Sequence, residues 1–231
     1  MTDYKISDQL LKVVVEDRET PHPWPTIPAD RTAFVVIDMQ KYFMAPNSQG
    51  EAESAREIVP TINRLAKAMR ERGGRVVWVQ TTTTDTRTAW SVRHELLSPA
   101  KAEVRLRAMK LGAEGFELWP TLEVKSEDMK VIKTLYSAFA QGSSDLAARL
   151  RSEGIEYVLI GGTYTNVCCQ ASAQDAMMLN FRTVMVSDCN AASTLQAHVA
   201  TLDNFLEFFG DVLNADEVLQ RLAPGKKTAA A

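Results

Sequence analysis

Strong charge of either sign is missing from this sequence. Its 26 lysine and arginine residues nearly balance 29 aspartate and glutamate residues, so the formal net charge is −3. Without a cationic field to attract phosphates, we expect neither nucleic acid nor an anionic membrane as a partner. No apolar run approaches the roughly 20 residues of a membrane-spanning helix, and the first residues lack the basic-then-apolar order of a secretory signal. We therefore expect a cytoplasmic protein.

Cysteine and histidine are also scarce, with three residues of each. An odd number of cysteines without a Cys-x-x-Cys pair fits neither a disulfide framework nor a zinc ribbon. The histidines, His22, His94 and His198, do not have the spacing of metal ligands. We therefore expect no metal and no cofactor. The three cysteines nevertheless lie close together in the sequence, between positions 168 and 189.

Short apolar runs alternate with segments of helical periodicity. The apolar runs predict six strands, at residues 33–38, 75–80, 129–133, 157–161, 183–187 and 211–213. Between them, apolar residues at three- and four-residue steps predict five helices, at about 55–72, 144–153, 167–179, 193–208 and from 214 onward. This alternation predicts a three-layer α/β Rossmann-like fold with a parallel sheet covered on both faces. The spacing of Ser193 and Gln196 predicts a capping box.

Three segments fall outside this alternation. We expect residues 1–231 to form a single domain, with residues 1–30 as an N-terminal arm and residues 224–231 as a flexible tail. The excursion 81–127 separates two strands and is too long for a structureless loop in a compact domain. We expect it to contain a helix and to act as a lid or an oligomer contact.

Three reactive side chains follow strands of the predicted sheet. Asp38 ends the predicted strand 33–38, and Lys133 ends the predicted strand 129–133. Cys168 opens the helix that follows the predicted strand 157–161. Each is unremarkable by itself, as a turn acid, a solvated lysine or a core thiol. Ligands of parallel sheets, however, bind at the carboxyl ends of the strands. A thiol at a helix start beside a lysine is expected to ionise readily, as a nucleophile requires, and a carboxylate can carry its proton.

Three motifs resemble the isochorismatase-like cysteine hydrolases. They are AFVVIDMQKYF at 33–43, KTLYSAF at 133–139 and GTYTNVC at 162–168, and the similarity continues in order over residues 33–220. The resemblance implies a six-stranded sheet of order 3-2-1-4-5-6, with Asp38, Lys133 and Cys168 as the catalytic triad. It also implies a cis peptide between Thr163 and Tyr164, which would direct the backbone N–H groups of Tyr164 and Cys168 toward an oxyanion.

The resemblance includes branches with different chemistry. The sequences TNVCC at 165–169 and DAMMLN at 175–180 resemble amidohydrolases of linear ureides, such as biuret, triuret, ureidoacrylate and N-carbamoyl amino acids. Tyr42, Phe43 and Gln80 resemble the isochorismatases, which hydrolyse a vinyl ether without a thiol. Nicotinamidases usually bind a metal through histidines that follow the first motif, and residues 44–75 contain no histidine. A nicotinamidase-like amidase and a catalytically silent binding module are further alternatives.

The resemblance to the ureide branch implies a thioester mechanism and a small amide or ureide substrate. Candidate substrate contacts are Gln40, Phe43, Gln80, Arg87, Tyr136 and Asn166. We expect Cys169 to be buried, because it turns about 100° away from Cys168 on a helix. The role of Cys189 stays open. The apolar content of residues 81–127 and the habits of the family predict a homo-oligomer, a dimer or a tetramer.

Overall fold

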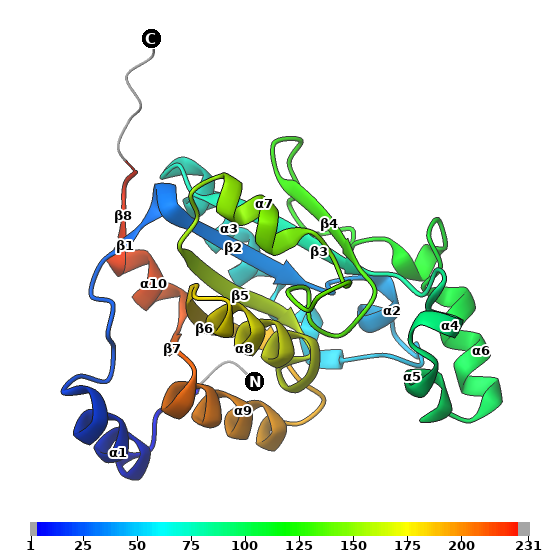
Figure 1. The fold of residues 1–231 in the computed structure, drawn as a ribbon, viewed down its shortest axis with the longest axis horizontal. Helices are drawn as coiled ribbons and strands as arrows, with labels where there is room; N and C mark the ends of the chain where they lie inside the picture. The colour runs from blue at the N-terminus through cyan, green and yellow to red at the C-terminus, as the bar shows by residue number, and fades with distance from the viewer. Residues whose placement is uncertain (1–3, 226–231) are drawn as a thin grey trace.

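A single parallel sheet organises the computed structural model, which describes residues 4–225 (Figure 1). Its six strands lie in the order β4-β3-β2-β5-β6-β7, and every neighbouring pair is parallel. The strands are β2 (Thr32–Ile37), β3 (Arg75–Thr81), β4 (Met129–Lys133), β5 (Tyr157–Thr163), β6 (Arg182–Ala191) and β7 (Asp211–Leu213). Numbered along the chain, these strands have the order 3-2-1-4-5-6, so the predicted three-layer α/β fold is confirmed. Two short strands, β1 (Ile27–Pro28) and β8 (Leu222–Ala223), pair separately.

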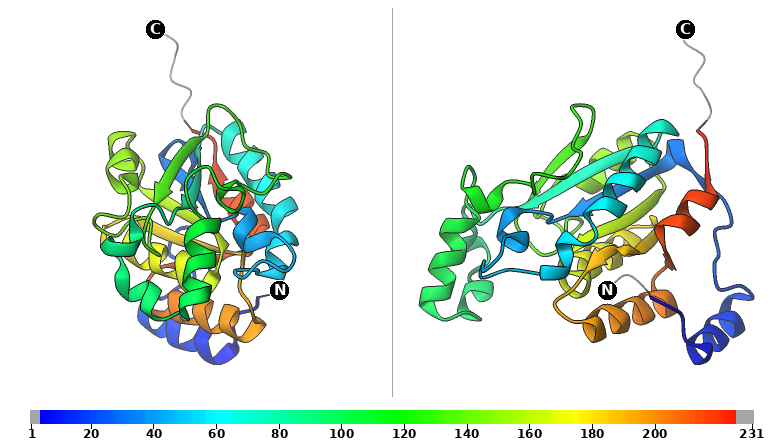
Figure 2. Two further views of the ribbon diagram at one scale, coloured as in Figure 1. Left: turned by 90° about the vertical axis from the view of Figure 1, so that its right-hand side faces the viewer. Right: turned by 180° about the vertical axis from the view of Figure 1, so that it is seen from behind.

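Helices cover both faces of the sheet (Figures 1 and 2). One face packs against α3 (Val59–Glu71) and α10 (Ala215–Arg221). The other packs against α7 (Leu146–Ser152), α8 (Gln170–Met178) and α9 (Leu195–Phe208). The two core clusters take alternate residues of β2, because successive strand side chains point to opposite faces. Burial on both faces explains why the central strands are continuous apolar runs.

Helix ends follow the local sequence, with one correction. After α3, Gly73 has a φ of 85°, a conformation that glycine adopts without steric cost. Asn214 and Glu217 form a capping box at the start of α10. At α9, however, the cap is Thr194, whose hydroxyl accepts from the backbone N–H of Ala197, and the prediction of Ser193 was wrong by one residue. Within the described residues, no helix is both long and apolar enough to span a membrane.

The structure describes most of the predicted N-terminal arm but little of the predicted C-terminal tail. The arm contains a helix that the sequence analysis did not predict, α1 (Asp8–Arg18), which buries Leu10 and Val14 in the core cluster that also contains residues of α9. Its apolar residues are spread around the helix and several are exposed, including Leu11, Val13 and Val15, so they give a weak periodic signal. Most of the predicted tail, residues 226–231, lies outside the described residues.

The excursion between β3 and β4 contains helices, as predicted. They are α4 (Thr86–Ala89), α5 (Ser91–Glu95), α6 (Pro99–Ala108) and a 3-10 turn (Glu114–Phe116). Figures 1 and 2 show α4, α5 and α6 together beyond the carboxyl ends of the strands. The short helix α2 (Lys41–Met44), which follows β2, lies beside the 3-10 turn. We call residues 82–116 the lid segment.

The segment after β5 differs from the expected single helix. A five-residue π-helical turn (Thr165–Cys169) precedes α8, so Cys168 lies inside this turn and not in the first turn of an α-helix. Strand β6 continues four residues beyond its predicted end and includes Cys189, which is fully buried. Cys189 belongs to the core cluster on the α3 face, whereas Cys168 and Cys169 belong to the cluster on the other face. All three cysteines are free.

Candidate active site

The fold brings Asp38, Lys133 and Cys168 together from three separate strands. Asp38 follows β2, Lys133 ends β4, and Cys168 lies in the π-helical turn after β5. All three residues are buried. The Nζ atom of Lys133 lies 2.9 Å from Oδ2 of Asp38, and Cys168 interacts with both charged groups. Their convergence follows from the parallel sheet, because the carboxyl ends of its strands lie at one edge.

Thr81 completes the network beneath the thiol, although the sequence analysis did not select it. Its hydroxyl donates to Oδ1 of Asp38 over 2.7 Å and accepts from Lys133 Nζ. Lys133 also donates to the carbonyl oxygen of Leu135 over 3.1 Å, so each of its three ammonium protons has an acceptor. The register pairs Thr81 with Lys133, which places both at the carboxyl ends of neighbouring strands.

Electrostatics hold the free site as an ion pair beside a neutral thiol. Burial, the largest effect, and the negative charge of Asp38 together raise the pKa of Cys168 to about 12, although the nearby charge of Lys133 opposes them. Burial by itself lowers the pKa of Lys133, but the charge of Asp38 and the interactions with Cys168 outweigh burial, and the pKa is raised. The expectation of a readily ionised thiol is therefore wrong for the free site. The dry surroundings and the adjacent carboxylate favour the protonated form.

The backbone around the nucleophile has the cis peptide that the resemblance implied, between Thr163 and Tyr164. The carbonyl oxygen of Tyr164 accepts from the N–H groups of Val167 and Cys169, each over 3.1 Å. The hydroxyl of Thr165 pairs with Nδ1 of His198 at 2.9 Å. These contacts fix the turn that carries Cys168. The oxyanion hole formed by the N–H groups of Tyr164 and Cys168 stays a prediction.

A cavity of about 250 Å³ opens above the thiol. Its lining includes Cys168 and Thr81 from the sheet edge and three tyrosines, Tyr42, Tyr136 and Tyr164. The lid segment contributes three cations, Arg93, Lys101 and Arg105. Tyr164 donates its hydroxyl proton to the carbonyl oxygen of Gly50 over 2.7 Å, which ties the nucleophile turn to the loop after α2. A cavity of this volume suits a small, largely enclosed molecule.

Two of the six predicted substrate contacts, Phe43 and Tyr136, line this cavity. Phe43 packs edge-on against Tyr164, with ring centroids 6.0 Å apart. Tyr136 packs edge-on against Trp90 of the lid segment, at 4.7 Å. The tyrosine of the second motif therefore links the sheet edge to the lid.

The prediction that Gln40 and Gln80 contact the substrate requires a correction. Their side-chain amides form hydrogen bonds with backbone groups, and neither residue lines the cavity. Gln40 is fully buried; its Nε2 donates to the carbonyl oxygens of Thr81 and Phe116, and its Oε1 accepts from the N–H of Thr81. Nε2 of Gln80 donates to the same Phe116 oxygen over 2.8 Å. Gln80 and Thr81 are consecutive in a strand and point to opposite faces, so only Thr81 reaches the catalytic groups.

Arg87 and Asn166 also lie outside the cavity lining. Arg87 is an exposed residue on α4 whose guanidinium pairs with Glu103 at 2.7 Å. Asn166 lies in the π-helical turn, with its Oδ1 buried and without a partner. Neighbouring residues in a helical turn point in different directions, so proximity to Cys168 in the sequence did not bring Asn166 into the site.

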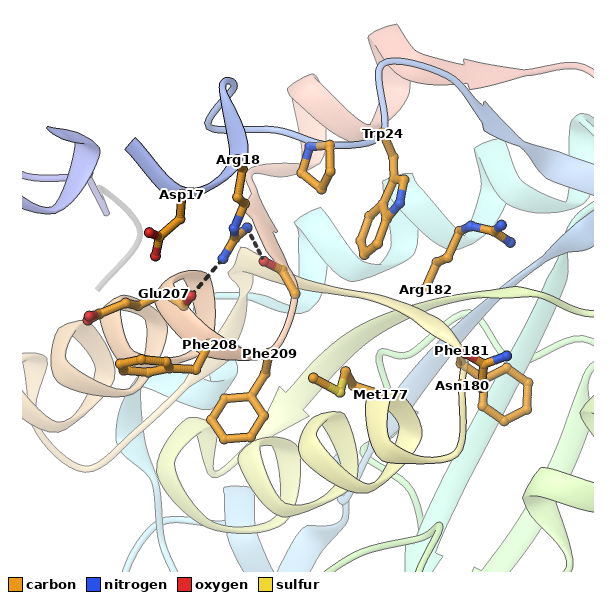
Figure 3. Close-up of a pocket in the computed structure, with 12 residues that line it drawn as sticks. Asp17, Arg18, Trp24, Met177, Asn180, Phe181, Arg182, Glu207, Phe208 and Phe209 are labelled. Carbon is orange, nitrogen blue, oxygen red and sulfur yellow. Dashed lines mark hydrogen bonds between the residues drawn. The ribbon is translucent and has the colours of Figure 1, made fainter. Parts of the chain in front are cut away.

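A second cavity, of about 540 Å³ (Figure 3), shares no lining residue with the cavity above Cys168. It is lined by residues of α1, α8 and α9 and reaches Arg182 at the amino end of β6. Figure 3 shows Arg18 directed toward the end of α9, where it donates to the carbonyl oxygens of Glu207 and Gly210. No cysteine, lysine or histidine lines this cavity. Volume alone would favour it, but the reactive groups are at Cys168.

The sequence also matches known proteins over most of its length. The model of the isochorismatase domain matches residues 32–217, which is most of the chain.

The chain belongs to the isochorismatase family.

Proteins similar to this chain include a probable inactive nicotinamidase, an amidohydrolase and a cysteine hydrolase. A probable inactive nicotinamidase of Arabidopsis thaliana is 30% identical over 174 residues, covering 74% of this chain and 86% of that protein. The ureidoacrylate amidohydrolase RutB of Caulobacter vibrioides is 27% identical over 89% of this chain and 98% of its own. The crystal structure of a cysteine hydrolase from Pseudomonas syringae pv. phaseolicola has a TM-score of 0.77 and 28% identity, and the match covers 86% of this chain and 94% of that chain. The chain is therefore a family hydrolase with amidohydrolase relatives.

The metal of the nicotinamidase branch has no matching ligand set in the described residues. Between residues 4 and 225, no three histidine, cysteine, aspartate or glutamate side chains form a group that could hold a metal ion. All three histidines have other contacts: His22 pairs with Asp211 at 2.8 Å, His94 contacts the hydroxyl of Thr86 at 3.1 Å, and His198 contacts the hydroxyl of Thr165 at 2.9 Å. The described residues therefore do not fit a resident metal.

Proposed function

We propose that this protein is a cysteine-dependent amidohydrolase that cleaves a C–N bond of a small linear ureide or carbamoyl amide through a thioester. The observation that carries the proposal is the placement of the Cys168 thiol in the cavity wall, directly beside the buried pair of Asp38 and Lys133. A nucleophile with an adjacent base is the arrangement of covalent catalysis. The similarity to RutB supports the ureide class.

The first half of the reaction acylates the thiol. Asp38 takes the proton of Cys168 as the sulfur attacks the carbonyl carbon, and Lys133 balances the charge of the carboxylate until the proton arrives. Because the resting thiol is neutral, proton transfer accompanies the attack, and Cys168 does not ionise beforehand. The tetrahedral intermediate then collapses to the thioester, and Asp38 returns the proton to the departing ammonia or amine.

The second half restores the enzyme. Asp38 removes a proton from a water molecule, the hydroxide adds to the thioester carbon, and the carbon–sulfur bond breaks. The sulfur regains a proton from Asp38, and the acid leaves the cavity. One amide and one water are consumed, and one amine and one acid are formed. The proposed N–H groups of Tyr164 and Cys168 would each contribute about 10²–10³ to the rate by stabilising the oxyanion.

The alternatives make different demands on the thiol. Vinyl-ether hydrolysis of the isochorismatase type requires no cysteine. A nicotinamidase-like amidase would favour an aromatic amide, and a silent binding module would hydrolyse neither a vinyl ether nor an amide. Ammonia release should be measured with biuret, triuret, ureidoacrylate, N-carbamoylsarcosine and nicotinamide. Loss of isochorismate should be followed separately.

Cysteine variants identify the nucleophile. We expect Cys168→Ala to reduce amide turnover by at least about 10³. The matched control is Cys169→Ala, because Cys169 is also fully buried but does not line the cavity. Near-normal turnover by Cys168→Ala on every amide that the parent hydrolyses would falsify the proposed mechanism. Turnover of isochorismate alone would favour the vinyl-ether alternative.

A further inference from the structure

The cavity above Cys168 is strongly one-sided in charge. Arg93, Lys101 and Arg105 reach it from the lid segment, and no aspartate or glutamate is among its lining residues. The catalytic carboxylate, Asp38, is not among the lining residues and is already paired with Lys133. A small enclosed space with this lining favours an anion over a neutral or cationic ligand.

Arg105 is the buried member of the three cations. It lies on α6 and is only 6% exposed. Its Nη1 lies 3.2 Å from the sulfur of Met109, a weak acceptor, and its buried Nε has no hydrogen-bond partner. The guanidinium carbon lies 5.7 Å from the centroid of the Tyr42 ring, another residue of the cavity wall. The donors of Arg105 are therefore poorly satisfied by the protein itself.

Nearby acids are engaged elsewhere. Glu103, on the same helix, pairs with Arg87 and Arg107, and Glu51 pairs with Arg56 at 2.8 Å. In the described part of the chain, no carboxylate lies within ion-pair distance of Arg105. A buried cation without a counter-charge is unfavourable, and an anionic ligand bound beside it would remove that penalty.

We propose that Arg105 binds a carboxylate of the substrate, so that the enzyme acts on a carbamoyl or ureido acid and not on a neutral ureide such as biuret. This inference rests on the amidohydrolase function proposed above and adds the substrate class and its anchoring residue. The planar guanidinium matches a carboxylate in shape and can donate two parallel hydrogen bonds to it. The anchor would hold the carbamoyl carbon over the thiol, a positioning effect that raises the rate of attack.

The anchor and the nucleophile line one small cavity. Arg105 and Cys168 line the same cavity of about 250 Å³. The charge of Arg105 also acts on the thiol, since it lowers the pKa of Cys168 against the larger effect of burial. A ligand with a carboxylate at one end and a carbamoyl group at the other can therefore reach both residues.

A pair of alkylating reagents tests the anchor without any turnover. Iodoacetate and iodoacetamide have nearly the same size, but only iodoacetate carries a carboxylate. The rates at which each modifies Cys168 should be measured by mass spectrometry at neutral pH, and the ratio of iodoacetate to iodoacetamide compared between proteins. We expect Arg105→Met to lower this ratio by about tenfold or more, as loss of a charge-assisted hydrogen bond implies. Arg105→Lys should retain part of the preference.

Arg87→Met is the matched control for the reagent ratio. Arg87 is a cation of the same lid segment, but it is exposed, pairs with Glu103 and does not line the cavity. Its loss should leave the ratio unchanged. An equal ratio in the parent and Arg105→Met, or an equal slowing of both reagents, overturns the proposal, because Arg105 would then act on the lid or the thiol and not on a carboxylate.

Binding covers the case in which Cys168 reacts with neither reagent. Calorimetry on folded Cys168→Ser protein should show tighter binding of N-carbamoylglycine than of its neutral amide, N-carbamoylglycinamide, by about tenfold or more. Adding Arg105→Lys should weaken this preference, and adding Arg105→Met should remove it. Equal binding of acid and amide contradicts the anchor.

Turnover separates this inference from the proposed function. In the active enzyme, Arg105→Met should raise the KM for a carbamoyl acid much more than the KM for its neutral amide. Hydrolysis of neutral ureides with no hydrolysis of carbamoyl acids would leave the amidohydrolase function standing and remove the carboxylate anchor. A carboxylate preference in the alkylation and binding experiments, without hydrolysis of any amide, would leave the carboxylate anchor standing and remove the amidohydrolase function.

Discussion

The Nζ atom of Lys133 lies 2.9 Å from Oδ2 of Asp38, and both side chains are completely buried. This ion pair lies beside a thiol whose pKa is raised to about 12 by burial and by the charge of Asp38. The resting site therefore contains a carboxylate that is ready to accept a proton and a sulfur that still carries one. Turnover should begin with transfer between these two groups, while Lys133 keeps the net charge of the dry site small.

The first prediction separates thiol ionisation from catalysis. Asp38→Asn removes a negative charge that raises the pKa of Cys168 and leaves the opposing charge of Lys133 in place. The pKa of the thiol should fall, so alkylation of Cys168 at neutral pH should become faster. Turnover should nevertheless drop by about 10²–10⁴, because the general base is lost. Asp145→Asn, at an exposed carboxylate, is the control, and slower alkylation in Asp38→Asn would contradict the prediction.

The second prediction concerns stability. Lys133→Met leaves the carboxylate of Asp38 buried without its cation, which should lower the free energy of unfolding by about 3–5 kcal/mol. Lys130→Met is the matched control in the same strand, because Lys130 is exposed, and its effect should stay within about 0.5 kcal/mol. Urea denaturation measures both. Combining Lys133→Met with Asp38→Asn should recover part of the loss, and purely additive losses would argue against the pair.

The third prediction concerns acid stability. Burial lowers the pKa of His198 to about 4, whereas the unfolded chain has a value near 6.5. Below about pH 6.5 the unfolded state therefore binds more protons, and the free energy of unfolding should fall, by up to about 3 kcal/mol, as the pH decreases toward 4. His198→Asn, which keeps a polar group near Thr165, should remove this part of the slope. Parallel curves for the two proteins in urea denaturation at pH 4–7 would exclude the effect.

The fourth prediction concerns the backbone that aligns the site. Gly162 has a φ of 124°, and a Cβ there would lie 2.0 Å from the carbonyl oxygen of Ile37, the residue before Asp38. Gly162→Ala should therefore separate β2 from β5 and destabilise the fold severely. Gly142→Ala is the control, because Gly142 also has a positive φ, of 78°, but open space around it; we expect a loss of about 1 kcal/mol. Similar melting temperatures for the two variants would refute the steric argument.

The fifth prediction concerns assembly. The lid segment exposes apolar side chains, with Leu96 75% and Val92 62% exposed. Clustered exposed apolar residues are typical of interaction surfaces, so we predict a homo-oligomer that buries them. Light scattering at micromolar concentration should give a mass well above 25.6 kDa, and Leu96→Glu should reduce it. A parent protein of monomer mass would refute the prediction.

Local patterns determined most of the fold. A strand buried on both faces must be apolar throughout, so the runs of β2, β3 and β5 were visible in the sequence. The same reasoning placed Asp38 and Lys133 at strand ends and thus at one edge of the sheet. It could not find Thr81, because threonines are common at strand ends and only the register with Lys133 distinguishes this one.

Side-chain direction and burial depend on contacts between distant segments, and these only the tertiary structure decided. The side-chain amides of Gln40 and Gln80 donate hydrogen bonds to the carbonyl oxygen of Phe116 in the lid segment. No local sequence pattern predicts these contacts. Arg105 has the sequence signature of a solvated helix face, yet it is buried and lines the same cavity as the thiol. The helix start and the lysine suggested an ionised Cys168, whereas desolvation, which is a property of the assembled core, keeps it protonated. The sequence by itself determined which reactive groups converge; packing determined their charge states and which neighbours face the substrate.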